Sequence, residues 1–489
     1  MAVPMNPEQR KAAAALLRER VPAAAEIGHL FARHGYELAL VGGLVRDVFL
    51  GQRPTGELDL ATDATPEQVL QISKGWADKT WTVGIAFGTV GLRKENSLFE
   101  ITTYRSEQYD RASRKPDVQY GRSLEEDLGR RDFTINAMAA RLPGYEIADP
   151  YRGFDALQEK VLRTPGRPEQ SFGDDPLRIL RAARFTAKLG FEVAADVRAA
   201  MTDQADRLAI VSPERITAEL TKLMLTPDPA LGIDLLVQTG VAEQVLPEVS
   251  RLRMEADEHH RHKDVYQHSL TVLRQAIALE PAYGLDDDLR VRLAALLHDV
   301  GKPRTRALLP DGRVAFRLHE VVGAKITRRR LTALRFPKDV VQDVSRLVEL
   351  HLRFHGYGEG EWTDSAVRRY VRDAGPLLTR LHVLTRADCT TRNREKARRL
   401  ARAYDALERR IVELSELEEM ARIRPELDGH EIMRILGVPA GPLVGKAYAF
   451  LLELRLEQGE LGRERVTQEL LRWAAAEGIV PPGPEPDGD

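Results

Sequence analysis

The sequence predicts an α/β head followed by a remainder built almost wholly of helices. Short apolar runs typical of strands, several of them bounded by glycine, fall before about residue 150. Beyond that point apolar residues recur at helical spacing as far as about residue 475. The 489 residues exceed one compact core and suggest about three domains at roughly 150 residues each.

The elements of the head follow in order along the chain. Helical spacing covers residues 8–34, and a second helix over residues 44–51 is closed by Gly51. Gly42 and Gly43 stand between the first strand and this second helix. The expected strands are residues 36–41, 57–61, 83–92 and 97–104. Residues 174–190 then form a strong helical pattern, with arginines on a different face from the leucines.

The composition fits a soluble globular protein, with 43% hydrophobic and 30% charged residues. Cys389 is the one cysteine, which excludes a disulfide framework and a multi-cysteine zinc site. No signal-peptide core and no apolar run of about 20 residues is present, so we expect a cytoplasmic protein with no membrane partner. The net charge of −2, from 72 basic and 74 acidic residues, means that any RNA binding must use local patches.

The most informative unit is a pair of carboxylates downstream of the double glycine. Residues two apart on a strand point to the same side, so Glu57 and Asp59 can together hold divalent cations. Two metals about 3.5–4 Å apart would activate an attacking hydroxyl and stabilise a leaving pyrophosphate. Glu100, on a neighbouring strand, offers a third carboxylate, with Phe99 and Ile101 facing the core.

Glycines between a strand and a helix let the backbone approach a phosphate closely. Each feature alone has a simpler interpretation, because two glycines usually make a tight turn and a Glu-x-Asp strand is usually a solvated face. Their order and spacing together favour catalysis and match the nucleotidyltransferase superfamily headed by DNA polymerase β, which implies a mixed sheet.

Three further motifs narrow this resemblance. RRDFTINAMA starts at Arg130, DPYRGFDAL covers residues 149–157, and DDPLRILRAARFTAKLGF covers residues 174–191. They resemble the motifs of class II tRNA nucleotidyltransferases and bacterial poly(A) polymerases over roughly residues 36–250. The charged segment at residues 104–121 resembles the mobile loop of that family.

The resemblance implies a role for each matching position. Glu57 and Asp59 would be Mg²⁺ ligands assisted by Glu100, and Asp175 and Arg178 would read the base edge of CTP or ATP without a template. Side chains at i and i+3 share a helix face, although an acidic helix start with an i,i+3 ion pair is the simpler interpretation of this segment. The remaining nucleotide-binding positions implied are Gly42, Gly43, Arg46, Asp47, Arg131, Asp132, Asn136, Arg181 and Arg184.

Two positions depart from the family pattern. The family usually has aspartate at the first metal position, where this chain has Glu57. The extra methylene requires the geometry to adjust, because Mg²⁺ demands near-ideal octahedral coordination. The first acid of the later motif is changed to Asp174, which is a milder departure.

The C-terminal part separates CCA addition from poly(A) addition. Residues 427–465 resemble the tRNA-contacting region of bacterial CCA-adding enzymes, and the run at residues 437–446 would bring Lys446 towards phosphate, unless it is an ordinary helix–turn–helix. We therefore expect addition of CMP, CMP and AMP to the tRNA 3′ end, with poly(A) addition as the alternative. The sequence leaves open whether all three nucleotides are added and what the oligomeric state is.

A second constellation lies in the middle third. His268, His298, Asp299 and Asp388 occur in the order H…HD…D, which resembles HD-superfamily phosphohydrolases. Imidazole and carboxylate ligands suit Mn²⁺ or Ni²⁺, and Mg²⁺ less well. Lys302 would steady a phosphate. His319 and His351 would extend the site to a second metal, whereas His259, His260 and His262 are more simply a solvated helix start.

By resemblance, the HD site would open 2′,3′-cyclic phosphodiesters or remove terminal phosphates, although some HD domains serve only as scaffold. Two other function classes stay open, an HD hydrolase with an inactive head and a non-catalytic RNA-binding protein. Arg328, Arg329 and Arg330 form a basic patch for RNA or a solvated helix face. The expected regions are a head at 1–165, a base-reading neck at 166–254, an HD domain at 255–395, a tRNA-binding helical region at 396–478 and a disordered tail at 479–489.

Overall fold

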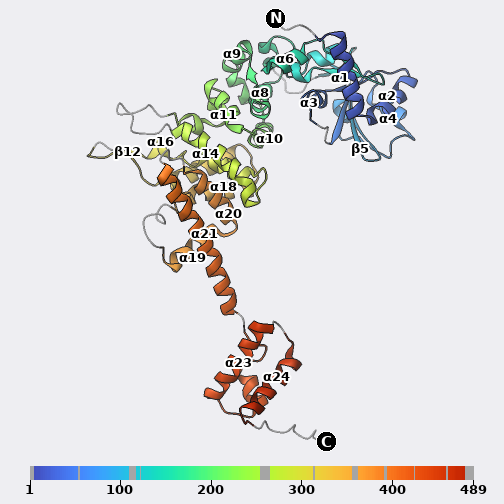
Figure 1. Cartoon of the computed structure of the whole chain (residues 1–489). Coiled ribbons are helices and arrows are strands. Elements are labelled where there is room, and N and C mark those ends of the chain that lie inside the picture. The colour runs from blue at the N-terminus through green and yellow to red at the C-terminus, as the bar shows by residue number, and fades with distance from the viewer. Residues whose placement is uncertain are drawn as a thin grey trace. The chain divides into compact units, whose positions relative to one another are not determined.

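The computed structural model describes residues 5–52, 56–108, 117–121, 123–253, 265–311, 314–354, 362–389, 394–422, 424–458 and 461–479. The chain divides into two compact units (Figure 1). The first comprises Met1–Phe354 and Pro376–Arg392, and the second comprises His355–Gly375 and Asn393–Asp489. The expected order of an α/β head and a helical remainder is confirmed.

A mixed seven-stranded sheet forms the head, with strand order β3-β4-β5-β2-β1-β8-β9. Strands β2 and β5 are parallel and every other neighbouring pair is antiparallel. The strands are β1 (Leu38–Val41), β2 (Glu57–Thr62), β3 (Lys79–Trp81), β4 (Thr89–Lys94), β5 (Ser97–Thr103), β8 (Ala139–Arg141) and β9 (Glu146–Ala148).

Helices cover one face of this sheet and leave the acidic residues on the other. Helix α2 (Ala23–Arg33) packs on β1, and α4 (Pro66–Ser73) packs on β4 and β5. Phe99 and Ile101 are buried, as the sequence predicted. Because side chains alternate along a strand, the buried face of β5 directs Glu100 to the opposite side.

The expected helix over residues 8–34 is wrong in one detail. Two helices form instead, α1 (Pro7–Arg20) and α2, and they are separated at Val21 and Pro22. Proline has no amide hydrogen and clashes with the preceding turn, so it begins a helix more readily than it continues one. Helix α3 (Gly43–Phe49) ends before Gly51, whose φ of +78° suits glycine.

Other boundaries also differ from the expectations. Residues 85–87 form a 3₁₀ turn (Ile85–Phe87), so the strand expected over 83–92 begins only at Thr89. The helix expected over 174–190 is divided at Asp175 and Pro176. Part of the charged segment at 104–121 forms a hairpin of β6 (Arg105–Gln108) and β7 (Asp117–Tyr120), and residues 109–116 lie outside the described residues.

The neck is helical and packs around α8 (Leu177–Leu189), which contacts α10 (Pro213–Met224) and α11 (Pro229–Gln238). Short elements complete the head and neck. These are α5 (Leu124–Gly129), the 3₁₀ turn Thr134–Asn136, α6 (Gly153–Glu159), β10 (Val161–Leu162), α7 (Pro168–Asp174), β11 (Glu192–Val193), α9 (Ala195–Asp203), the 3₁₀ turn Ala205–Ile210, α12 (Ala242–Val245) and α13 (Pro247–Ser250).

The rest of the first unit is a helical cluster with one small hairpin. Helix α17 packs along α18, and α14 packs on α15 and α20. The elements are α14 (Val265–Leu279), the 3₁₀ turn Glu280–Tyr283, α15 (Leu289–Leu297), α16 (Lys302–Thr305), β12 (Arg306–Leu308), β13 (Val314–Phe316), α17 (His319–Ala333), α18 (Lys338–Leu350), the 3₁₀ turn Gly375–Leu377 and α20 (Leu378–Ala387).

The second unit contains α19 (Asp364–Ala374) against α21 (Arg394–Arg422), with an ion pair between Asp364 and Arg410 at 2.8 Å. Its last three helices share an apolar core that includes Ile432, Leu451 and Leu470. These helices are α22 (Gly429–Leu436), α23 (Pro442–Gln458) and α24 (Arg463–Ala476). Residues 480–489, most of the expected tail, lie outside the described residues.

Candidate functional site

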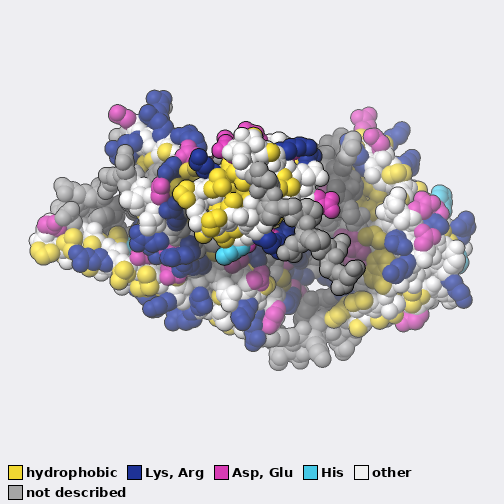
Figure 2. Space-filling model, turned by 90° about the horizontal axis from the view of Figure 1, so that it is seen from below, with side chains coloured by type: hydrophobic (Ala, Val, Ile, Leu, Met, Phe, Trp, Pro, Cys, Tyr) yellow, Lys and Arg dark blue, Asp and Glu magenta, His cyan; other side chains and the backbone are white. Residues whose placement is uncertain are grey.

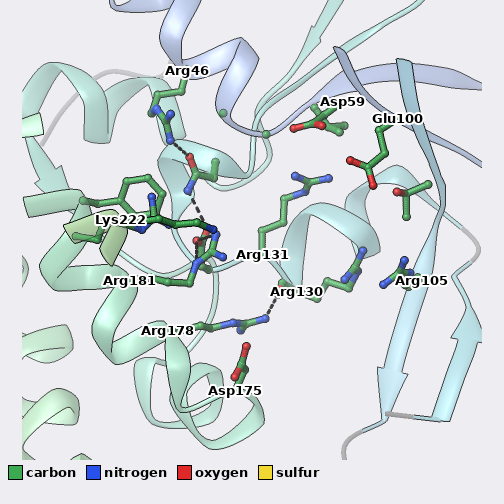
Figure 3. A pocket seen from close by; sticks show the side chains of 18 of the residues that line it. Arg46, Asp59, Glu100, Arg105, Arg130, Arg131, Asp175, Arg178, Arg181 and Lys222 are labelled. Carbon is green, nitrogen blue, oxygen red and sulfur yellow. Dashed lines mark hydrogen bonds and ion pairs between the residues drawn. The ribbon is translucent and has the colours of Figure 1, made fainter. Parts of the chain in front are cut away.

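A cavity of about 630 Å³ lies between the acidic face of the head sheet and the helices of the neck (Figure 3). It contains eight basic side chains and four acidic ones, so most of its wall suits an anion such as a triphosphate. The basic residues are Arg46, Arg105, Arg130, Arg131, Arg178, Arg181, Arg184 and Lys222, and the acidic ones are Asp59, Glu100, Asp132 and Asp175.

The acidic edge of this cavity is formed by two neighbouring strands. Asp59 on β2 is in register with Glu100 on β5, and Glu57 lies two residues earlier on the same side of β2. Burial raises the pKa of Asp59, Arg131 opposes that rise, and Glu57 adds to it. Burial, then Glu57 and Asp59, also raise the pKa of Glu100. Mutual repulsion of this kind is relieved by a bound cation, so the three carboxylates fit a divalent metal site.

The double glycine contributes a close approach of the backbone. Gly42 has φ +74°, and a Cβ added there would lie 2.9 Å from a guanidinium nitrogen of Arg131. The same Cβ would lie 3.9 Å from Oδ2 of Asp59. A larger residue would therefore be strained by the positive φ and would press against the Arg131 guanidinium. Gly42 and Gly43 both line the cavity.

A buried carboxylate anchors two of the cavity's arginines. Asp132 accepts hydrogen bonds from Nε of Arg181 at 2.7 Å and from the side-chain amide of Asn136 at 2.9 Å. The side-chain amide oxygen (Oδ1) of Asn136 accepts from Arg46 at 2.5 Å. Burial would raise the pKa of Asp132, but Arg181 and these hydrogen bonds outweigh it and hold that pKa below its ordinary value. The anchored guanidiniums are therefore fixed before any nucleotide arrives.

One expected contact differs. Asp47 is not among the residues that line the cavity; it accepts from Arg46 at 2.7 Å and lies 3.7 Å from Nζ of Lys188. Its geometry is that of a support for Arg46. Arg184 lines the cavity, pairs with Glu219 at 2.7 Å and stacks on Phe185.

The two residues expected to read the base both line the cavity but do not pair with each other. Asp175 precedes α8, whose first residue is Leu177, and contacts Arg215 at 3.1 Å. Arg178 donates to Oγ of Ser171 at 2.9 Å and to the carbonyl oxygen of Arg130. The i,i+3 ion pair considered from the sequence is thus absent, because Pro176 leaves Asp175 in an extended conformation outside the helix.

The DPYRGFDAL motif packs against the turn Thr134–Asn136, which carries the cavity residue Asn136. Both carboxylate oxygens of Asp149 accept backbone hydrogen bonds, from Gly153 at 2.6 Å and from Phe154 at 3.0 Å. A Cβ on Gly153 would lie 2.2 Å from the carbonyl oxygen of Thr134. This glycine therefore lets α6 press against the turn that carries Asn136.

Sequence reasoning missed several cavity residues. Lys222 lies on α10 about 30 residues beyond the last motif helix, and no local pattern marks it. Arg105 lies just after β5, the strand that carries Glu100. Its role in the cavity could have been predicted from its position after the ITTY sequence. Arg130 opens a recognised motif but was given no role.

The residues of the H…HD…D pattern lie close together inside the helical cluster. Nε2 of His268 lies 2.9 Å from Oδ1 of Asp388, and Nε2 of His298 lies 3.2 Å from Oδ2 of Asp299. Oδ1 of Asp299 lies 3.3 Å from Nε2 of His319. Two groups of side chains have spacings that fit a metal ion, namely His268, His298 and Asp388, and Asp299, His319 and His351.

Three of these histidines share one tautomer. Nδ1 of His298, His319 and His351 donates to the backbone carbonyl three residues earlier, at 2.9, 2.8 and 2.6 Å. This bond leaves Nε2 as the ring nitrogen of each that can face a metal. Nε2 of His351 is buried without a hydrogen-bond partner among the described residues, and Nε2 of His319 faces Oδ1 of Asp299 at 3.3 Å. An orphaned lone pair in such a position fits a metal ligand.

Charge at this cluster is unevenly distributed. Burial lowers the pKa of His351 to about 3 and keeps its imidazole neutral. Burial also acts to lower the pKa of His298, but Asp299 and Asp388 outweigh it and raise that pKa to about 9. Carboxylates that attract a proton so strongly would attract a divalent cation in its place.

The close packing of Gly301 holds together the group formed by Asp299, His319 and His351. A Cβ on Gly301 would lie 2.0 Å from the carbonyl oxygen of His319, so only glycine lets α16 meet the start of α17. Lys302, which was expected to steady a phosphate, donates to Asp299 at 2.7 Å. His259, His260 and His262 lie outside the described residues.

Only two of the three arginines of the basic patch expected on α17 are exposed. Arg330 donates to Glu248 at 2.8 and 3.1 Å, and Glu248 is 5% exposed, so this arginine has a structural partner. Arg328 and Arg329 are exposed. On the face that Figure 2 shows, basic side chains form separate groups interspersed with acidic and apolar ones, in keeping with local patches.

Three segments of the chain match described protein families. Residues 38–163 match the "Poly A polymerase head domain", residues 190–252 the "Probable RNA and SrmB- binding site of polymerase A", and residues 265–393 the "HD domain". The fold and the carboxylate-edged cavity therefore define a nucleotidyltransferase head joined to an HD domain.

Whole-chain relatives are more specific. The A-adding tRNA nucleotidyltransferase of Deinococcus radiodurans is 35% identical over 452 residues, 89% of this chain and 95% of the relative. The CCA-adding enzyme of Geobacillus thermodenitrificans is 44% identical over 211 residues, 43% of this chain and 51% of that enzyme. The solved Bacillus stearothermophilus CCA-adding enzyme in complex with CTP is similar over 94% of this chain and 98% of its own, with 26% identity and a TM-score of 0.58. The chain belongs to the tRNA nucleotidyltransferase family. Among the described residues, no helix is long and apolar enough to span a membrane.

Proposed function

We propose that this nucleotidyltransferase adds CMP, CMP and AMP, taken from CTP and ATP, to the 3′ end of tRNA. One observation carries the proposal, the register of Asp59 with Glu100 at the edge of an arginine-lined cavity of about 630 Å³. The carboxylates supply ligands for cations, and the arginines supply donors for a triphosphate. Both parts are needed to transfer a nucleotide and release pyrophosphate.

In this proposal Mg²⁺ is held by Glu57 and Asp59, with Glu100 assisting. When bound, two such ions would lower the pKa of the attacking hydroxyl and stabilise the leaving pyrophosphate. Glu57 is exposed at the start of β2, so its longer side chain has room to adopt a ligand geometry. Arg131 and the Asp132-anchored Arg181 hold the triphosphate, while Arg46, Asp47 and Asn136 keep those groups in position.

Base selection falls to Asp175 and Arg178. Arginine presents donors and aspartate presents acceptors, which together complement the exposed edge of cytosine or of adenine. Arg215, which contacts Asp175 at 3.1 Å, would be displaced by the base. Arg184 and Phe185 form the neighbouring wall of the cavity.

The proposed regions follow the expectations from sequence. The head covers residues 1–165, the neck 166–254, the HD domain 255–395 and the tRNA-binding helical region 396–478. Lys446 is exposed in the first turns of α23 and would contact a tRNA phosphate. We also propose a cytoplasmic location, which a single cysteine favours.

Extension of a tRNA that lacks its 3′ end tests this function. The protein receives Mg²⁺ with CTP, ATP, both or neither, and product length and sequence are read on a gel. Addition of C, C and A followed by arrest supports the proposal. Addition of adenosine alone, or of two cytidines alone, would limit the activity to one step, and a long A-tail would establish poly(A) addition instead.

A second activity is favoured by the fixed tautomers around Asp299. We propose that the HD cluster binds a divalent metal such as Mn²⁺, Ni²⁺ or Mg²⁺ and hydrolyses a terminal or 2′,3′-cyclic phosphate on damaged tRNA. Lys302 would steady the phosphate. If cyclic-phosphate hydrolysis survives the double substitution His298→Ala, Asp299→Ala, the assignment of this activity to the HD cluster is refuted. If the protein extends no tRNA with Mg²⁺ or Mn²⁺, the function we propose instead is that of an HD hydrolase with an inactive head.

A further inference from the structure

An indole ring lies beside the carboxylates on the same face of the sheet. Trp81, Gly91, Glu100 and Asp59 stand in one row across strands β3, β4, β5 and β2. Residues opposite each other in a sheet project to the same side. The absence of a side chain at Gly91 leaves space that the indole fills, because a Cβ there would lie 1.9 Å from Cε2 of Trp81.

The adjoining row supplies positive charge. Lys79, Arg93, Leu98 and Glu57 are in register across the same four strands, and all four are exposed. Lys79 and Arg93 therefore flank Trp81 on the acidic face, at the edge of the sheet. The connection between β3 and β4 is also apolar and exposed, with Val83 92% and Phe87 60% accessible.

Trp81 and most of the arginine-lined cavity lie on opposite sides of the carboxylates. Most of the cavity lining lies beyond Asp59, on β1, the Gly42 turn and α8, and the lining ends at Glu100, Thr102 and Arg105, whereas Trp81 lies on the β3 side of Glu100. In a two-metal transfer the attacking hydroxyl and the leaving pyrophosphate are held on either side of the reacting phosphorus. With the triphosphate in the part of the cavity between the Gly42 turn and α8, the side over β4 and β3 is left for the RNA end.

We infer that Trp81 stacks on a base of the single-stranded RNA 3′ end, with Lys79 and Arg93 at the adjoining phosphates. This inference rests on the proposed function, since it identifies how that site receives its acceptor. Aromatic rings stack on unpaired bases, and basic side chains contact the phosphates of the RNA backbone. Trp81 offers the ring, and Lys79 and Arg93 offer the positive charges. Trp81 is a positioning residue, because the reacting atoms lie at the carboxylates.

Steady-state kinetics with separate variation of tRNA and CTP tests this role. Trp81→Ala should raise KM for tRNA about 5- to 150-fold, the range expected for loss of one base–aromatic stack. KM for CTP should change less than about 2-fold, and Trp81→Phe should recover most of the loss. Trp76→Phe is the matched control, because that indole contacts Phe99 and donates to Glu26 at 2.6 Å on the covered face.

Binding without catalysis provides the second measurement. RNA should quench the fluorescence of the wild type and of Trp76→Phe, and quenching should fall in Trp81→Phe. Lys79→Ala with Arg93→Ala should reduce the salt dependence of RNA binding. Equal changes of both KM values in Trp81→Ala, with a lowered melting temperature, would overturn the inference. A wild type that extends no tRNA would instead refute the proposed function, so the two failures are distinguishable.

Discussion

Asp132 is the internal anchor of the nucleotide cavity, and its replacement by asparagine tests that role. The carboxylate is 6% exposed and contacts Arg181, whose side chain is 35% exposed. Removal of one partner of a buried ion pair costs about 3–5 kcal/mol. Because Arg181 can turn partly to water, we expect Asp132→Asn to lower the free energy of unfolding by about 2 kcal/mol.

The same substitution should weaken nucleotide binding. A hydrogen bond to a charged group contributes about 1.5–3 kcal/mol, so a poorly anchored Arg181 should raise KM for CTP roughly 10- to 100-fold. Asp155 offers a matched control, because it is equally buried, pairs with Arg152 at 2.7 Å and does not line the cavity. Asp155→Asn should lose stability without a change in KM.

The assays are urea unfolding of the full chain and CTP incorporation into tRNA. Since the pKa of Asp132 is lowered in the folded state, its contribution is present above the unfolded pKa of about 3.9 and is lost as pH falls through the folded pKa. The stability difference between wild type and Asp132→Asn should therefore shrink below about pH 4. An equal rise of KM in both variants would refute the anchoring argument.

Three further predictions follow from individual contacts. Glu57→Gln should slow single-turnover incorporation with Mg²⁺ by more than about 100-fold, whereas Glu57→Asp should retain activity; equal rates would exclude Glu57 as a ligand. Glu280→Gln removes the buried one of two carboxylates that pair with Arg292 at 2.7 Å, the other being the exposed Asp287, and should cost about 3–5 kcal/mol in urea unfolding; an unchanged midpoint would contradict this. Gly153→Ala directs a Cβ to 2.2 Å from the carbonyl oxygen of Thr134 and should cost about 1–3 kcal/mol and raise KM for CTP; a wild-type melting temperature would disprove the close approach.

The acidic edge of the site could be predicted because strand periodicity alone decides it. Glu57 and Asp59 share a face in any strand that contains them, and the burial of Phe99 and Ile101 assigns Glu100 to the same side. Register between β2 and β5 cannot be read from either strand by itself. The structure supplies it by pairing Asp59 with Glu100.

The basic wall was less accessible to sequence reasoning. Asp175 was expected on the same helix face as Arg178, but Pro176 ends the preceding turn and leaves Asp175 extended. Asp47 was expected at the triphosphate, yet its partners are the neighbouring Arg46 on α3 and Lys188 on α8. Lys222 joins the cavity only through the contact of α10 with α8, which no local pattern reveals.

Incorporation of labelled CMP into tRNA that lacks its 3′ end, with Mg²⁺, tests the central claim most directly. Wild type should be compared with Asp59→Asn and with the double variant His298→Ala, Asp299→Ala. We predict that the wild type and the double variant incorporate CMP at similar rates and that Asp59→Asn incorporates none. Incorporation that survives Asp59→Asn but is lost in the double variant would contradict the assignment of nucleotide transfer to the head cavity.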